Sequence, residues 1–179
     1  MQQSELNQTD RELVRGCMEN NRLVQRALYD RFSTSLFTLI YRLTGDREAS
    51  NDILQDAFIE IFRSIATFRF ESSLYTWMRT ITTRNAMGYL NKNTRMQVLT
   101  DEIPDMPSES PADFTAEHLE KAILSLPGQA RSVFILVEIE GYRHREVAEM
   151  LKINEGTSKS QLNYAKKLLR QRLTRKADE

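Results

Sequence analysis

The sequence of 179 residues predicts an all-α protein with two small helical domains joined by a flexible acidic linker. Apolar residues recur at steps of three and four on both sides of this linker, as they do in amphipathic helices. The N-terminal half shows no sustained alternation of apolar and polar residues between turn residues, which a half-buried strand would require. Three of the four prolines fall in the linker, where they disfavour helix. We therefore expect domains at 1–96 and 117–179, with the linker at 97–116.

The formal net charge of zero hides a strong partition of charge along the chain. Residues 1–96 hold 13 basic and 11 acidic side chains, and residues 118–179 hold 12 basic and 8 acidic ones. Residues 97–117 hold six acidic side chains and no Lys or Arg. The net charge therefore does not exclude a nucleic-acid partner for either domain.

Cysteine usage and the N-terminus indicate a cytoplasmic protein. A single cysteine, Cys17, excludes an internal disulfide framework and cannot by itself form a zinc site. The first residues are polar and lack the basic start and apolar core of a signal peptide. No apolar run is long enough to cross a bilayer, so we expect no membrane insertion.

Three helices are predicted in the N-terminal domain, over about 28–43, 48–65 and 74–90, with Gly45 and Asp46 marking a helix end or turn. The polar face of the helix over 48–65 contains the apolar residue Ile59. That face is either simply solvated or the docking site of a protein partner.

Aromatic and basic residues alternate between the last two of these helices, around Phe68, Arg69 and Phe70. Exposed rings stack on unpaired bases while guanidinium groups hold phosphates, so this segment is a candidate for binding single-stranded nucleic acid. The alternative is that the rings fill the core, which we favour for Trp77. Phe70, between two charged residues, is the better candidate for exposure.

The C-terminal domain contains a helix-turn-helix pattern. Two short helices separated by Pro127 are followed by a helix from about 143, a turn at 152–154, and a helix from about 155. From 155 to 176 there are seven basic residues and one acidic residue. A basic helix can be merely solvated, but after this turn it favours insertion into the major groove of DNA.

The order of these motifs resembles that of the extracytoplasmic-function (ECF) sigma factors, two-domain initiation factors of bacterial RNA polymerase. In the first domain the resemblance rests on Tyr41–Asp46, on Asp52–Phe58 and on the helix with Trp77. In the second it rests on Leu126-Pro127, Glu140–Tyr142, Glu146–Ala148 and Glu155–Ser160.

The resemblance implies three binding surfaces and no catalytic residue, cofactor or metal. The surface for the β′ clamp helices of core RNA polymerase comprises Asp52, Gln55, Asp56 and Ile59. The surface for the −10 promoter element, with its flipped base, comprises Arg69, Phe70, Glu71, Ser72, Ser73, Trp77, Arg84 and Asn85. The surface for the −35 element comprises Thr157, Ser158, Lys159, Ser160, Gln161, Tyr164 and Lys167.

The resemblance also implies docking of the second domain on the polymerase β flap, passage of the acidic linker along the RNA exit path, and inhibition by an anti-sigma partner that in this family is often anchored in the membrane.

Several positions depart from the family pattern: Arg84, Gly88, Asn91, Lys152, Ser158 and Gln161. These departures bear on the promoter sequence that is recognised more than on the class of protein. The main alternative is a helix-turn-helix regulator that binds duplex DNA without polymerase. An enzyme is disfavoured because neither His118 nor His144 belongs to a catalytic motif.

Overall fold

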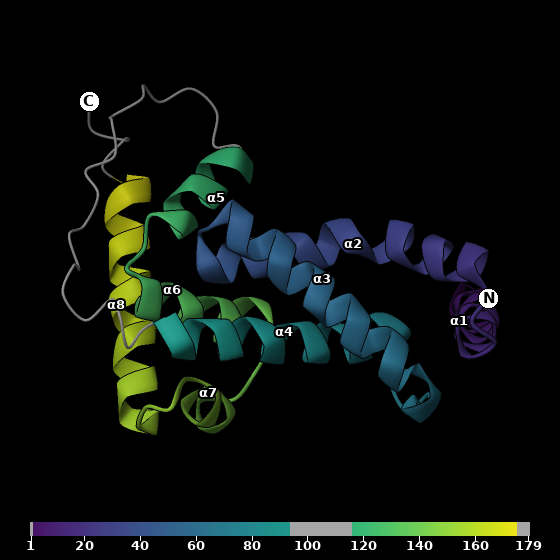
Figure 1. Ribbon diagram of the computed structural model, residues 1–179. Coiled ribbons are helices and arrows are strands. Elements are labelled where there is room, and N and C mark those ends of the chain that lie inside the picture. Colours follow the sequence, from purple (N-terminus) through teal and green to yellow (C-terminus); the bar gives the residue numbers. More distant parts are fainter. Residues whose placement is uncertain (1, 94–115, 175–179) are drawn as a thin grey trace. The chain divides into compact units, whose positions relative to one another are not determined.

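A computed structural model describes residues 2–93 and 116–174, and within these ranges every regular element is a helix (Figure 1). The chain forms two compact units, the first from residues 1–41 and 46–89 and the second from residues 42–45 and 90–179. The all-α prediction is confirmed for the described residues. The predicted linker, apart from residue 116, lies outside them.

The first unit contains α1 (Gln2–Met18), most of α2 (Arg22–Thr44), α3 (Arg47–Ser64), the short 3-10 helix η1 (Ile65–Thr67) and most of α4 (Leu74–Asn93). Its core consists of apolar side chains from all four α-helices. Among its buried members are Val14 of α1 and the larger side chains of Leu28, Leu36, Ile40, Ile61, Leu74 and Met78.

Asp46, predicted to lie at a helix end or turn, caps the start of α3. Its backbone is extended, and its carboxylate accepts hydrogen bonds from the backbone amides of Glu48 at 2.9 Å and Ala49 at 3.1 Å. These bonds satisfy amides that have no partner within the helix. The cap fixes the register of α3 and therefore the set of residues on its outer face.

The helix α1 is an addition to the three helices predicted for this domain. Asp10, only 7% exposed, forms an ion pair with Arg31 of α2 at 3.1 Å and accepts a hydrogen bond of 3.4 Å from the backbone amide of Leu74. Since Leu74 is the first residue of α4, Asp10 fastens α1 against the end of the loop that precedes α4.

The second unit contains α5 (Ala116–Leu124), α6 (Gly128–Phe134), a π-helical turn η2 (Ile135–Ile139), α7 (His144–Leu151) and α8 (Glu155–Thr174). Both α6 and α7 pack against α8, around a core of Val133, Leu136, Val147, Leu162 and Ala165.

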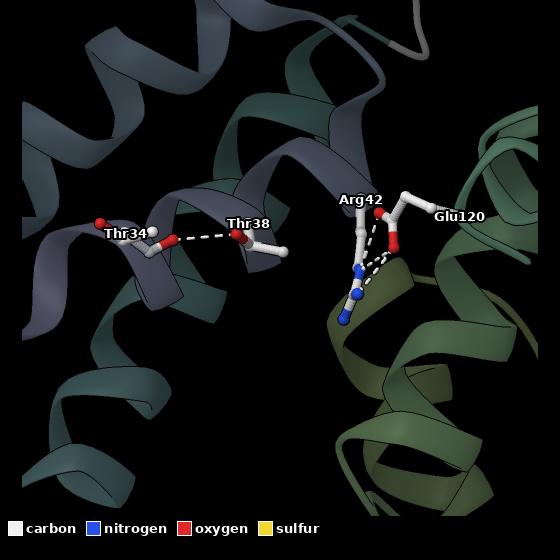
Figure 2. Close-up of polar contacts among 4 residues, drawn as sticks. All are labelled: Thr34, Thr38, Arg42 and Glu120. Carbon is white, nitrogen blue, oxygen red and sulfur yellow. Dashed lines mark hydrogen bonds and ion pairs between the residues drawn. The ribbon is translucent and has the colours of Figure 1, made fainter. Parts of the chain in front are cut away.

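Polar contacts among residues of α2 and α5 are shown in Figure 2. Within the first unit, the Thr38 hydroxyl donates to the Thr34 carbonyl at 2.9 Å (Figure 2). Within the second unit, which includes residues 42–45, Arg42 forms an ion pair of 2.7 Å with Glu120 (Figure 2). Both groups of this ion pair are about 70% buried, with side-chain exposures of 30% and 29%.

The turn between α7 and α8 is built on a left-handed residue. Lys152 has φ 54° and ψ 43°, and its backbone amide donates to the carbonyls of Ala148 and Glu149. This conformation closes a helix but disfavours residues with a Cβ atom. Lys152 therefore occupies a position that suits glycine.

Candidate functional surfaces

The outer face of α3 presents the four residues predicted to contact polymerase. Asp52, Gln55 and Asp56 are exposed, and Ile59 is 41% exposed although it is apolar. The opposite face, which includes Ile53, Leu54, Ala57, Phe58 and Ile61, is buried. The helical period therefore places the apolar side chain of Ile59 beside two carboxylates and one amide on the outer face of α3.

The aromatic segment between η1 and α4 has one buried ring and one exposed ring. Phe68 is 7% exposed and packs against both Phe70 and Trp77, with ring centroids 4.7 Å and 5.4 Å away. Phe70 is 40% exposed and has the unusual positive φ of 59°. Phe68 thus anchors the loop, while the backbone of Phe70 turns its ring outward. The exposure predicted for Phe70 is confirmed.

The remaining residues of the predicted −10 surface differ in availability. Arg69, Glu71, Ser72, Ser73 and Arg84 are exposed, whereas Trp77 is half-buried against Phe68. The Ser73 hydroxyl accepts a hydrogen bond of 3.1 Å from the Thr76 amide, which caps the start of α4. Ser73 therefore has a structural part in the loop as well.

Asn85 connects this surface to α3. Its side-chain amide nitrogen donates to the Glu60 carboxylate at 2.7 Å and to the Ile81 carbonyl at 3.0 Å. Both amide hydrogens of Asn85 are thus used within the protein. Its side-chain carbonyl oxygen is the atom left to accept a hydrogen bond from a ligand.

The N-terminal half of α8 presents most of the residues predicted to contact duplex DNA. Lys159, Ser160, Tyr164 and Lys167 are exposed, and Thr157 and Gln161 are half-buried. The positions three and four residues apart lie on one side of the helix, and the first turns of α8 directly follow the turn at Lys152. A helix presented in this way fits the major groove.

Ser158 does not belong to this surface. It is completely buried, and its hydroxyl lies 2.9 Å from Nδ1 of His144 at the start of α7. The side chain of Ser158 therefore holds the two helices of the helix-turn-helix together, and the predicted contact of this side chain with DNA is not supported. The pairing of a polar residue in the core with His144 was not visible from sequence spacing.

Two ion pairs reduce the positive charge that α8 presents. Lys159 lies 2.6 Å from Glu155, and Lys166 lies 2.9 Å from Glu138. The hydrogen bond and charge of Lys159 hold the pKa of Glu155 below its ordinary value, with smaller contributions from His144 and Arg145. Lys159 thus has a competing partner within its own helix.

Among residues 2–93 and 116–174, no group of three or more His, Cys, Asp or Glu side chains is arranged to hold a metal ion. Cys17 is buried, and this burial raises the pKa of its thiol. None of the helices in these ranges has the length and hydropathy needed to span a membrane.

The fold is that of a helical protein with two units, the second of which contains a helix-turn-helix. Sequence comparison identifies the family. The family model "Sigma-70 region 2" matches residues 28–96, and the model "Sigma-70, region 4" matches residues 116–169. The chain belongs to the sigma-70 family.

The relatives are ECF sigma factors and other RNA polymerase sigma factors. The chain is 28% identical over 153 residues to the ECF RNA polymerase sigma factor SigE of Mycolicibacterium smegmatis, covering 80% of this chain and 59% of that protein. It is 26% identical to the RNA polymerase sigma factor YlaC of Bacillus subtilis, covering 85% of this chain and 93% of that protein. It is 24% identical to the ECF RNA polymerase sigma-E factor of Haemophilus influenzae, covering 92% and 95%.

Solved structures support the fold. The sigma factor RpoE in its complex with the anti-sigma factor NepR from Bartonella quintana matches with a TM-score of 0.54 and 20% identity, over 86% of this chain and 98% of that one. CnrH in its complex with the cytosolic domain of CnrY matches with a TM-score of 0.52 and 17% identity, over 95% and 99%.

Proposed function

We propose that this chain is an ECF-type sigma factor that binds core RNA polymerase, recognises the −35 and −10 promoter elements and promotes strand opening. The observation that carries the proposal is the order of the two family matches. Region 2 covers the α3 face and the aromatic loop, and region 4 covers the helix-turn-helix. A regulator that acts on duplex DNA without polymerase would have no use for the first of these regions.

The proposed mechanism uses binding energy and no catalytic residue. The second domain binds the −35 duplex through α8, and the first domain binds polymerase through α3. The exposed ring of Phe70 then stacks on a base that has left the helix. Unstacking one base costs a few kcal/mol, and capture of that base offsets part of the cost.

The acidic segment 97–116 is proposed to follow the RNA exit path of polymerase, where its charge mimics nucleic acid. The second domain is further proposed to dock on the β flap. An anti-sigma protein that covers the polymerase-binding face is the proposed regulator, and the site of action is the cytoplasm. Of the structural relatives, RpoE is in a complex with the anti-sigma factor NepR, and CnrH is in a complex with the cytosolic domain of CnrY.

The decisive test is run-off transcription with core polymerase and a library of genomic promoter fragments. We expect specific products that depend on the chain. No specific product from any fragment would refute the proposed function. Binding of the isolated chain to duplex promoters as tightly as in the presence of polymerase would favour the helix-turn-helix regulator instead.

The polymerase surface is tested by a double variant, Asp52→Arg with Gln55→Ala. Both side chains are exposed, so we expect unchanged helicity and at least tenfold weaker binding to core polymerase, since a repulsive charge is introduced into the interface. Arg26→Ala on the exposed side of α2 is the matched control. Equal co-purification of the double variant and wild type with polymerase would contradict the assignment of this face.

A further inference from the structure

A hydrogen bond between side chains joins the proposed polymerase-binding helix to the proposed −10 surface. The side-chain amide nitrogen of Asn85 on α4 donates to the Glu60 carboxylate on α3 at 2.7 Å, across 25 positions of sequence. Both residues belong to the first unit, and Glu60 directly follows Ile59 on α3. The predicted sites do not include Glu60. Its carboxylate therefore acts from a second helix on a residue of the −10 surface.

The two hydrogen bonds of the Asn85 amide fix the way in which this group faces. The same nitrogen donates to the Ile81 carbonyl, one turn earlier on α4, at 3.0 Å. Since an asparagine amide has two hydrogens and one carbonyl oxygen, the two bonds use its whole capacity to donate. Turning the amide over would place its oxygen against a carboxylate and a carbonyl, which both accept and cannot donate. Glu60 thus holds the Asn85 oxygen in the outward position.

The surface of α4 beside Asn85 is open. Arg84 is exposed and Asn85 is half-buried. Gly88 lies three residues further along the helix and therefore on the same side. It is exposed, and a Cβ atom there would meet no other atom within 4 Å. The absence of a side chain at this position leaves space beside Asn85 that a ligand can enter.

An amide held in this way distinguishes between bases. An asparagine with a free amide binds adenine through one donor and one acceptor. With its hydrogens occupied, Asn85 offers an acceptor alone. Adenine and cytosine carry exocyclic amino groups that donate to such an oxygen, whereas guanine and thymine carry carbonyl oxygens in the corresponding places. Two acceptors that face each other leave both without a hydrogen bond.

We infer that Glu60 is a positioning residue that sets the base specificity of the −10 surface. By holding the Asn85 amide, it restricts the base that contacts Asn85 to adenine or cytosine. The inference rests on the proposed function, because the contact of Asn85 with the −10 element belongs to that function. Glu60 itself touches no base, and it acts on the choice of base through Asn85.

Base preference at the −10 element tests this role. Holoenzyme made from core polymerase and the full chain is titrated with a premelted promoter from the run-off assay, which carries each base in turn at each −10 position of the displaced strand. Asn85→Ala identifies the position that Asn85 contacts, as the one at which the preference of the wild type is lost. There the wild type should bind adenine or cytosine about fivefold tighter than guanine or thymine, as one hydrogen bond allows.

Variants of Glu60 should change this ratio of affinities. Glu60→Ala should reduce it to about twofold or less, because one amide hydrogen of Asn85 is then free to donate to a guanine or thymine oxygen. Glu60→Gln should keep the ratio, since the glutamine carbonyl oxygen still accepts from the Asn85 amide. Glu48→Ala removes another exposed acidic side chain from α3 and is the matched control, which should leave the ratio unchanged.

A reversed pair tests the direction of the hydrogen bond. In Glu60→Gln with Asn85→Asp, the glutamine amide donates to the aspartate, and the aspartate still offers the base an acceptor alone. We expect this double variant to retain the preference for adenine or cytosine, although its added charge next to DNA weakens binding of all four bases. Loss of the preference in the double variant would contradict the role of the fixed acceptor.

The ratio also separates a positioning role from a structural one. A bond that only stabilised the first unit, or a charge that only repelled DNA, would change the affinities for all four bases by the same factor. An unchanged ratio in Glu60→Ala therefore overturns the inference. Weaker binding of this variant to core polymerase with an unchanged ratio would assign Glu60 to the polymerase surface instead.

The remaining outcomes distinguish the role of Glu60 from the proposed function. A wild type that initiates but prefers guanine or thymine at the position identified by Asn85→Ala overturns the inference alone. The same holds if Asn85→Ala changes the preference at no position. A wild-type chain that supports no initiation refutes the proposed function, and the role of Glu60 falls with it.

Discussion

The two proposed DNA-binding surfaces are built in opposite ways. The −35 surface is the side of a regular helix, α8, whose side chains project at fixed helical intervals from a scaffold that α7 braces. The −10 surface is a loop in which a buried ring, Phe68, supports an exposed one, Phe70, with a positive φ. A regular helix suits the repeating edge of a duplex, whereas an outward ring suits a single base that has left its stack. This difference matches the proposed targets, a −35 element that stays double-stranded and a −10 element in which the strands open.

The largest expected effect separates the supporting ring from the exposed ring. Phe68→Ala should lower the free energy of unfolding of the first unit by about 3 kcal/mol or more, because it leaves a cavity between Phe70 and Trp77. Phe70→Ala should lower it by less than about 1 kcal/mol. It should instead weaken binding to a premelted template by about fivefold or more.

Urea unfolding followed by the fluorescence of Trp77, the single tryptophan, measures the first effect, and binding titration measures the second. Equal losses of stability in Phe68→Ala and Phe70→Ala would contradict the assignment of the supporting role to Phe68 and the binding role to Phe70.

The next effect concerns the hydrogen bond between His144 and Ser158, which joins the two helices of the helix-turn-helix. His144→Ala leaves the buried Ser158 hydroxyl without its partner on α7 and should cost about 1–2 kcal/mol in the second unit. The double variant His144→Ala with Ser158→Ala should cost less than the sum of the two single variants, since both atoms of one hydrogen bond are then absent. Hydrogen exchange of α7 and α8 amides measures the loss. Strict additivity of the two substitutions would show that the side chains do not interact.

A smaller effect is expected at the duplex-binding surface. Glu155→Gln frees Lys159 from its ion pair and removes an acidic group from the first turn of α8, so duplex affinity of the holoenzyme should rise about threefold. Lys159→Ala is the opposite control and should lower both affinity and salt slope. An unchanged salt slope in Lys159→Ala would argue against a phosphate contact by this residue.

The same pair predicts a pH dependence. The pKa of Glu155 is depressed in the folded chain, so its stabilising pairing with Lys159 is complete above the ordinary pKa of a glutamate and is lost as pH falls through the depressed value. The wild type and Glu155→Gln should therefore converge in duplex affinity at that acidic pH. A constant ratio of their affinities across this range would show that the carboxylate does not restrain Lys159.

Much of the architecture could be predicted from the helical spacing of apolar residues and from the residues that mark turns and helix ends. The spacing of Ile53, Ala57 and Ile61 predicted α3 and its outer face, and Gly45 with Asp46 predicted the turn that precedes it. The exposure of Phe70 followed from its charged neighbours. In each of these cases a local pattern is sufficient, because the helix or turn that results decides which side chains face outward.

What the sequence did not predict depends on contacts between distant segments. The docking of α1 requires Asp10 to meet Arg31 and the Leu74 amide, and no spacing rule connects position 10 with position 74. Ser158 was placed among DNA-binding residues because its neighbours are, yet α7 supplies it with a partner inside the core. Polar residues close to a functional stripe are ambiguous until the packing of the adjacent helix is known.

The remaining effects concern backbone conformation, at Gly88 in the first unit and at Lys152 in the second. Gly88 of α4 is exposed, and a Cβ atom there meets no other atom within 4 Å, so Gly88→Ala should raise stability by about 1 kcal/mol through helix propensity alone. Lys152 carries a left-handed backbone, so Lys152→Gly removes a Cβ penalty of about 1 kcal/mol.

The added freedom of glycine in the unfolded chain offsets most of that second gain, and we expect about 0.5 kcal/mol or less. Gly141→Ala, at φ 75°, is the contrasting variant and should destabilise the second unit, because it introduces the penalty that Lys152→Gly removes. Urea unfolding of the three variants, followed by fluorescence for the first unit and by hydrogen exchange for the second, measures these changes. A destabilised Lys152→Gly would show that the Lys152 side chain contributes more than its backbone costs, and the turn would then owe its shape to that side chain.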